Sequence, residues 1–223
     1  MDEPMNEPSS ESCETCRRPR AVCVCDRVVP FETTRRVLIL QHPQEQDVLL
    51  GTSQLLAASL PQASVTIGLS WPNLKHALGD DTIDPQRWAL LFPDRETEGP
   101  SCKSARGADV SPRTLEGLVV LDGTWSQAKT LYWRNAWLKK LARLSLAPKE
   151  PSIYGRLRAE PRKDFVSTLE AVGAALSACG EDPEIEAGLR RVFRTLVQRA
   201  RDTSLPAEAR RLPKRGRPKR EPR

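Results

Sequence analysis

The sequence lacks long runs of apolar residues, is poor in aromatic residues and has only two histidines. No segment approaches the roughly 18–20 consecutive apolar residues that a membrane-spanning helix requires. Its first residues are acidic, whereas a signal peptide begins with basic residues and continues with an apolar stretch. We therefore expect a soluble, cytoplasmic protein with no membrane partner.

Several common catalytic motifs are also missing. The sequence contains no G-x-G-x-x-G, no phosphate-binding P-loop, no G-x-S-x-G and no H-E-x-x-H. Hydride transfer on a classical dinucleotide-binding fold, NTP hydrolysis and serine hydrolysis therefore lose their usual support.

At 223 residues the chain has the length of one large or two small domains, and its 39% of hydrophobic residues is enough for a core. Positive charge is concentrated near the end, since residues 190–223 hold 13 basic and 3 acidic residues. Such a block fits a polyanion such as nucleic acid or an acidic membrane. We expect residues 1–12 to be a disordered acidic segment and residues 204–223 a disordered basic tail, because neither composition supports a core.

Four of the six cysteines lie within 13 residues, and they are Cys13, Cys16, Cys23 and Cys25. In a reducing compartment, clustered cysteines are more often metal ligands or catalytic groups than disulfide partners. The C-x2-C and C-x-C pairs supply the four thiolates of a closed, structural zinc site. Two disulfides, or a redox dithiol at the C-x2-C pair, are the alternatives. Residues 13–30 are thus predicted to form a zinc-binding segment.

Residues 31–203 read as one α/β domain, because short aliphatic runs alternate with segments of helical periodicity. Strands are expected at residues 36–41, 64–69, 88–92, 117–121 and 142–146, and helices at residues 45–60, after residue 125 and in two terminal segments. This order predicts a mostly parallel sheet with flanking helices. The polar residues 94–113 are expected to form a surface insertion.

In such sheets ligands bind beyond the carboxyl ends of the strands, so the residues that follow each strand are candidates for the site. Asp122 follows a buried strand and is our candidate catalytic base. Gly123 lets the backbone approach a ligand, and Thr124 can cap a helix whose amide groups point into the site. Simple N-capping is the alternative role for this element. His42 also follows a strand, either as a pocket residue or as an ordinary structural histidine.

The helix expected after residue 125 interleaves tryptophans with cations. Lys129, Trp133 and Trp137 recur at intervals of four, and residues 125–163 hold 10 basic and 2 acidic residues. Tryptophans offer stacking surfaces to bases, and cations neutralise phosphates. Lys129, Trp133 and Arg134 are therefore predicted to bind RNA. The alternative is that the tryptophans pack in the core while the cations are merely solvated.

Six motifs follow one another along residues 13–180, and they are the four clustered cysteines and residues 41–45 (QHPQE), 91–93 (LFP), 121–125 (LDGTW), 154–158 (YGRLR) and 167–171 (STLEA). In this order they resemble the DTW-domain proteins, the tRNA-uridine aminocarboxypropyltransferases. The resemblance implies a SPOUT-like α/β fold, which can be knotted. It also implies that S-adenosylmethionine donates its 3-amino-3-carboxypropyl group to N3 of a uridine in tRNA, giving acp3U and 5′-methylthioadenosine.

The resemblance further implies contacts to the donor from His42, Phe92, Pro93, Gly123, Thr124, Trp125, Tyr154 and Arg156. Either Arg156 or Arg158 could bind the carboxylate of the donor with two hydrogen bonds, and Arg158 is also assigned to RNA. Two other functions stay open. They are an RNA methyltransferase of the SPOUT type that uses the same cofactor, and a non-catalytic, zinc-containing RNA-binding module. A monomer is favoured over a dimer.

Overall fold

The computed structural model describes residues 12–92, 99–146, 150–155, 157 and 166–203. Within them lies one six-stranded sheet with the order β2-β1-β5-β3-β6-β4. Its strands are β1 (Arg36–Gln41), β2 (Ala63–Ile67), β3 (Trp88–Leu91), β4 (Ser101–Lys103), β5 (Gly117–Asp122) and β6 (Ala142–Ser145). Only β4 runs antiparallel to its neighbour, β6. The predicted mostly parallel α/β sheet is confirmed.

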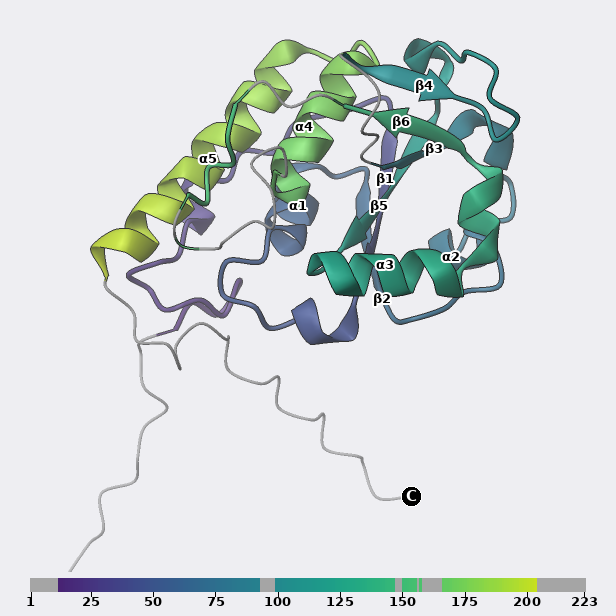
Figure 1. Ribbon diagram of the computed structural model, residues 1–223. Coiled ribbons are helices and arrows are strands. Elements are labelled where there is room, and N and C mark those ends of the chain that lie inside the picture. The colour runs from purple at the N-terminus through teal and green to yellow at the C-terminus, as the bar shows by residue number, and fades with distance from the viewer. Residues whose placement is uncertain (1–11, 93–98, 147–149, 156, 158–165, 204–223) are drawn as a thin grey trace, which may run out of the picture.

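Helices cover both faces of the sheet (Figure 1). The α-helices are α1 (Ser53–Ser59), α2 (Leu74–Leu78), α3 (Trp125–Arg134), α4 (Thr168–Ala178) and α5 (Pro183–Asp202). Short 3-10 turns are η1 (Cys25–Arg27), η2 (Pro43–Glu45), η3 (Pro85–Arg87), η4 (Pro112–Thr114) and η5 (Ala136–Lys140). Helices α1, α4 and α5 lie on one side, and α2 and α3 lie on the other. None of the described helices is long and apolar enough to cross a bilayer.

The central strands are buried on both faces, which explains why their sequences are continuous apolar runs. Alternate residues of β1 divide between two hydrophobic clusters. Val37 and Ile39 pack with α4 and α5, whereas Leu38 and Leu40 pack with α2 and η5. All four side chains are fully buried. Each contributes roughly 1.5–3 kcal/mol by leaving water.

Two helices begin with capping boxes near the carboxyl edge of the sheet. Thr124 and Gln127 cap α3, and Ser167 and Glu170 cap α4. In each box the N-cap hydroxyl accepts from a backbone N–H and the partner side chain accepts from the N-cap N–H, so that two otherwise unpaired amides are satisfied. Glu170 also accepts from Ser152 Oγ at 2.9 Å and so holds the chain after β6 against α4.

The prediction of a single helix over residues 45–60 is wrong. The chain instead forms η2, an irregular loop, and the shorter α1. The reason lies in Arg18, which is buried and donates to the carbonyls of Leu49 and Gly51 at 2.9 and 2.8 Å. Those carbonyls would accept from backbone amides in a continuous helix, and the guanidinium takes them instead.

The polar stretch expected as a surface insertion also contains structure. Residues 101–103 form β4, the edge strand of the sheet, and Cys102 is buried in the core behind it. The disorder predicted for residues 1–12 and 204–223 concerns segments that lie outside the described residues, apart from Ser12.

Candidate functional site

The last residues of β1 and β5 lie opposite each other, with Gln41 in register with Asp122. Asp122 is only 6% exposed. Its Oδ2 accepts from Gln41 Nε2 at 2.8 Å and its Oδ1 accepts from Thr168 Oγ1 at 2.7 Å. Thr168 is the first residue of α4, so two strand ends and one helix N-terminus fix a single carboxylate.

Asp122 is not the cap of α3, because Thr124 holds that position, as the sequence predicts. The N-capping role therefore belongs to Thr124, and the Asp122 carboxylate is left for another role. Neither of the two donors that the described residues offer to Asp122 is charged, and beyond these two bonds each oxygen keeps a lone pair for a further proton or donor.

The turn after Asp122 has no room for a side chain. A Cβ at Gly123 would lie 2.9 Å from Gln127 Cβ and 3.4 Å from His42 Cβ. The backbone N–H of His42 donates to the carbonyl of Asp122 at 2.9 Å, and Gln127 Nε2 donates to Gln44 Oε1 at 3.0 Å. The loops that follow β1 and β5 are thus tied together. His42 itself is half-buried, and its Nδ1 accepts from Gln44 N.

A row of exposed aromatic and basic side chains runs along α3 into η5. We call Trp125, Lys129, Trp133 and Lys139 the α3 aromatic surface. Trp125 is 41% exposed and Trp133 is 62% exposed, and Lys139 Nζ lies 4.3 Å from the centre of a Trp133 ring. Lys129 and Arg134 are also exposed.

Trp137 lies elsewhere, although its sequence spacing matches that of Trp133. Its Nε1 donates to the carbonyl of Trp71 at 2.9 Å, and its ring packs against the cluster beneath α3. Of the two tryptophans, Trp137 therefore packs against the core, whereas Trp133 is exposed to solvent.

Phe92 follows β3 and is half-buried on the α3 side of the sheet. Its ring centre lies 5.1 Å from that of Tyr132, and the Arg143 guanidinium lies 5.8 Å from the Phe92 ring. Arg143 also donates to the Tyr132 hydroxyl at 2.9 Å. Of the neighbouring predicted site residues, Pro93 lies outside the described part of the chain.

Tyr154 lies in the core between the loop after β6 and α5. It is 2% exposed, its hydroxyl donates to the carbonyl of Leu50 at 2.7 Å, and its ring meets Phe193 edge to face. The structure therefore gives Tyr154 a packing role, and its contact to a donor stays a prediction. Arg156 and Arg158 lie outside the described residues.

The four clustered cysteines converge. Their Sγ atoms all lie within 4.8 Å of one another, with 3.9 Å between Cys13 and Cys25 and 3.6 Å between Cys16 and Cys23. Four thiolates at about 2.3 Å from one tetrahedral ion are about 3.8 Å apart. All four are free thiols, against the two-disulfide alternative. The cluster could hold one metal ion.

The thiols of this cluster differ in acidity. Hydrogen bonding by the backbone amide of Cys16 is the main cause that lowers the pKa of Cys13 to about 6. Burial raises the pKa values of Cys23 and Cys25. A bound cation would favour the thiolate form of all of them, because a coordinating thiol is deprotonated.

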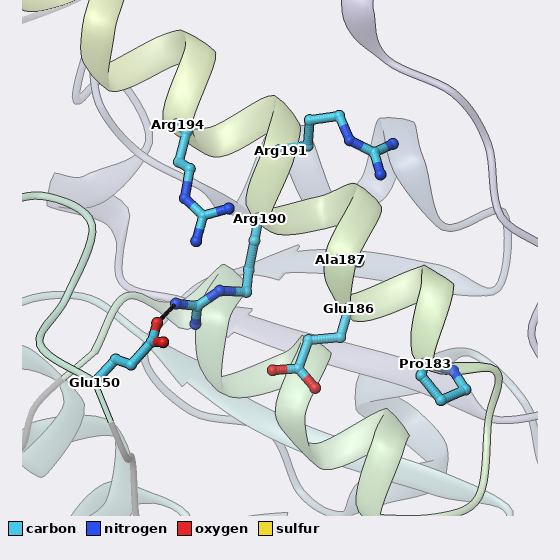
Figure 2. Close-up of a pocket in the computed structure, with 7 residues that line it drawn as sticks. All are labelled: Glu150, Pro183, Glu186, Ala187, Arg190, Arg191 and Arg194. Carbon is cyan, nitrogen blue, oxygen red and sulfur yellow. Dashed lines mark hydrogen bonds and ion pairs between the residues drawn. The ribbon is translucent and has the colours of Figure 1, made fainter.

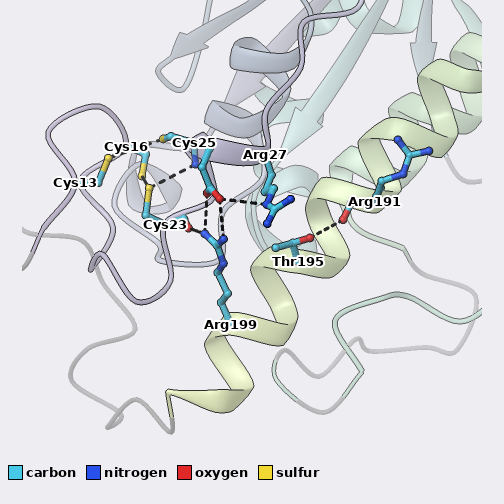
Figure 3. Close-up of polar contacts among 9 residues, drawn as sticks. Cys13, Cys16, Cys23, Cys25, Arg27, Arg191, Thr195 and Arg199 are labelled. Atoms are coloured by element: carbon cyan, nitrogen blue, oxygen red, sulfur yellow. Dashed lines mark hydrogen bonds and ion pairs between the residues drawn. The ribbon is translucent and has the colours of Figure 1, made fainter.

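The cysteine segment, residues 13–30, is anchored to α5 and to the loop after β1. Arg199 of α5 donates to both carboxylate oxygens of Asp26 at 2.9 Å and to the carbonyl of Cys23 (Figure 3). This ion pair lowers the pKa of Asp26. Val22 and Val24 are buried in the same cluster as α4 and α5. Arg18 of the same segment donates to Leu49 and Gly51 and so ties it to the loop after β1.

A hollow of about 380 Å³ lies on α5 and contains none of the predicted site residues (Figure 2). Arg190 in it is paired with Glu150 at 2.5 Å, and Arg191 is paired with Glu184 at 2.9 Å. Its arginines are thus largely neutralised by neighbouring carboxylates. The hollow does not bear on the chemistry around Asp122.

Sequence reasoning missed two residues of this site, Gln41 and Thr168. Both are neutral, and neither shows a spacing that suggests chemistry. Each nevertheless stands in a motif that carries the family resemblance, QHPQE or STLEA. That position was the only available signal.

Comparisons with known proteins agree with this resemblance. Residues 10–201 match the DTW domain family. The chain is 32% identical over 191 residues to "tRNA-uridine aminocarboxypropyltransferase 2" of Drosophila melanogaster, covering 83% of this chain and 73% of that protein. It is 30% identical over 188 residues to the protein of that name from Macaca fascicularis, covering 82% and 61%.

A plant relative, "tRNA-uridine aminocarboxypropyltransferase A" of Arabidopsis thaliana, is 28% identical over 212 residues, with 83% of this chain and 79% of that protein covered. The chain thus spans less than two thirds of the macaque relative, but more of the fly and plant proteins. No solved structure matches it.

Proposed function

Because the chain belongs to the DTW domain family, we propose that it transfers the 3-amino-3-carboxypropyl group of S-adenosylmethionine to N3 of a uridine in tRNA. Relatives named for this kind of transfer support the proposal. The observation that carries it is the buried Asp122, held by Gln41 and Thr168 at the carboxyl edge of the sheet. We further propose a cytoplasmic, monomeric enzyme of the SPOUT-like class, which can be knotted.

The strand edge suits such a donor. It offers a buried acceptor at Gln41 that has no described partner, and an exposed ring at Trp125 on which a base can stack. The capped N-terminus of α3 adds a positive dipole end. S-adenosylmethionine, when bound, supplies an electrophilic methylene carbon next to a positively charged sulfur. The proposed donor contacts stay His42, Phe92, Pro93, Gly123, Thr124, Trp125, Tyr154 and Arg156.

Asp122 supplies the base. N3 of uridine is a weak nucleophile while it carries its proton, so a group positioned to accept that proton speeds the reaction. As Asp122 takes the proton, N3 forms a bond to the methylene carbon. The bond between that carbon and sulfur breaks, its electron pair goes to sulfur, and 5′-methylthioadenosine leaves. Gln41 and Thr168 keep the carboxylate in one orientation throughout, which limits the cost of positioning.

Beyond Trp125, which is assigned to the donor, the α3 aromatic surface is the proposed contact to tRNA, together with Arg134 beside it. Trp133 presents an open ring to an unpaired base, and Lys129, Lys139 and Arg134 neutralise nearby phosphates. Arg158 is a further proposed RNA contact.

Zinc is the proposed ion at the four cysteines. Four thiolates and their spacing suit it, and they fill a tetrahedral shell, which gives the ion a structural role. It would hold the cysteine segment against α5 and the loop after β1.

Mass analysis of nucleosides tests the reaction. Unmodified tRNA is incubated with the full chain and S-adenosylmethionine and then digested. A uridine heavier by one aminocarboxypropyl group, with release of 5′-methylthioadenosine, is the expected result. A uridine heavier by one methyl group would identify a methyltransferase instead. No modified nucleoside despite tRNA binding would identify a binding module.

A further inference from the structure

Gln41 holds an acceptor that the described structure does not use. The residue is 2% exposed, and its Nε2 donates to Asp122 Oδ2 at 2.8 Å. Because only the nitrogen of an amide can donate to a carboxylate, this bond fixes which way the amide is turned. Oε1 therefore points to a different position, where it accepts no hydrogen bond from the described residues.

Buried acceptors nearly always accept a hydrogen bond in folded proteins, so an acceptor without one indicates a missing partner such as a ligand. Other buried polar atoms without a described partner belong to Asp47, Ser53, Ser59, Ser64 and Trp88. The Asp47 atom lies 3.0 Å from Arg17 Nη1, and serine hydroxyls can rotate. Gln41 differs from all of these because it stands directly beside Asp122 at the ligand edge of a parallel sheet.

Two adjacent acceptors select for a particular kind of donor group. The N3–H of uracil is a single donor between two carbonyl oxygens, so a second protein acceptor next to Asp122 would face one of those oxygens. An ammonium group has three N–H donors and no acceptor, so it brings no oxygen of its own against the amide oxygen. The Gln41 oxygen thus fits an ammonium better than it fits the uracil ring.

We propose that Gln41 Oε1 binds the α-ammonium of the aminocarboxypropyl group and thereby selects a donor that carries its amino group. The assignment rests on the proposed function, since that function names the donor. The ammonium is three bonds from the methylene carbon that N3 attacks. Asp122 and Gln41 can therefore act on the two reactants side by side. Asp122 takes the N3 proton of the uridine, and Gln41 binds the ammonium of the transferred group.

Calorimetric titration without tRNA tests this assignment. The probes are S-adenosylmethionine and 5′-methylthioadenosine, which lacks the amino acid part. Gln41→Met keeps the length of the side chain but removes the acceptor. We expect it to weaken S-adenosylmethionine binding about 10-fold or more, as for a lost charge-assisted hydrogen bond, and to leave 5′-methylthioadenosine binding within about twofold. Equal weakening of both, or an unchanged affinity for S-adenosylmethionine, would overturn the assignment.

Two further variants keep the test decisive. Ser59→Ala removes another buried oxygen without a described partner, away from the strand edge, and should change neither affinity. Gln41→Glu keeps oxygen acceptors and should retain the preference for S-adenosylmethionine over 5′-methylthioadenosine, even if Gln41→Met does not fold. Loss of that preference in Gln41→Glu would count against the assignment.

The wild-type chain separates this inference from the proposed function. If it binds S-adenosylmethionine but attaches no aminocarboxypropyl group to tRNA, the proposed function fails and the ammonium assignment is still decided by the titrations. If it binds no S-adenosylmethionine, both fail.

Discussion

The two sides of the strand edge are built in opposite ways. On the α4 side, Asp122 and Gln41 are buried and Thr168 is half-buried, and short hydrogen bonds join the two neutral donors to the one carboxylate. On the α3 side, Trp125 and Trp133 are open to solvent and accompanied by lysines. Buried groups fix geometry, which a bond-making step needs. Exposed rings and charges tolerate many partners, which suits a large polyanion.

The strongest test of the buried side is Asp122→Asn. The variant keeps the size of the side chain but cannot take up the N3 proton, so the turnover rate should fall by about 10² or more. Affinity for S-adenosylmethionine should change little, because the proposed ammonium acceptor at Gln41 remains. Single-turnover kinetics and calorimetry check both statements.

The pH dependence of Asp122→Asn separates its possible roles. At higher pH uridine N3 ionises without help, so the rate of the variant should recover in part. An equal loss at every pH would give Asp122 a purely structural role. A preserved rate with weak donor binding would make it a ligand of the cofactor.

The cysteine segment packs against α4 and α5 and so supports the buried side of the strand edge. Cys16→Ser should release the metal and cost at least about 2 kcal/mol, lowering the melting temperature by roughly 4–8 °C. The rate should fall less than in Asp122→Asn. Elemental analysis and thermal unfolding measure the two effects. Cys102→Ala, which alters a buried cysteine outside the cluster, is the control and should leave the metal content unchanged.

Trp133→Ala tests the exposed side. Loss of one stacking ring should weaken tRNA binding by about 1–3 kcal/mol without changing the melting temperature or the affinity for S-adenosylmethionine. Val29→Ala, at a similarly exposed apolar residue, is the control and should bind tRNA normally. An unfolding temperature that drops in Trp133→Ala would place the ring in the core after all.

The smallest expected effect concerns Asp26. Its ion pair with Arg199 lowers its pKa below the usual 3.8, so the pair stabilises the folded state above that pH. Asp26→Asn should therefore lower the melting temperature slightly at pH 7, because the pair is exposed to solvent. The difference from the wild type should shrink as the pH falls below 3.8 and Asp26 becomes protonated. A difference that persists at low pH would exclude the ion pair as its cause.

The sequence was a good guide wherever local pattern and burial coincide. The runs at β1 and β5 are apolar because both faces are covered, and these strands are where the patterns place them. Residues 101–103 gave no such signal, since β4 is a three-residue edge strand with a single buried side chain.

The four-residue spacing of the tryptophans is misleading at the point where α3 ends and the chain turns into η5. Trp133 and Trp137 are four residues apart, yet α3 ends at Arg134 and η5 begins at Ala136. The buried Asn135 between them donates to the carbonyls of Leu69 and Leu131, which breaks the register. No spacing rule reports this switch.

The candidate site was predicted only in part. Asp122 stands out as an acid at a strand end. Its two partners are neutral and lie 81 and 46 residues away in the chain, so their contact depends on the sheet order and on the place of α4. Gln41 and Thr168 could be found only once the fold was known.

The contact between Arg199 and the carbonyl of Cys23 spans 176 residues, and it has a consequence for synthesis on the ribosome. The four thiols emerge well before the helix that docks them. At about 5–20 residues per second, the interval is on the order of 10–35 s. If the cluster binds a metal as proposed, a nascent chain that meets none in that time would present four undocked thiols to any oxidant nearby, and the supply of metal during translation would affect how many chains reach the docked state.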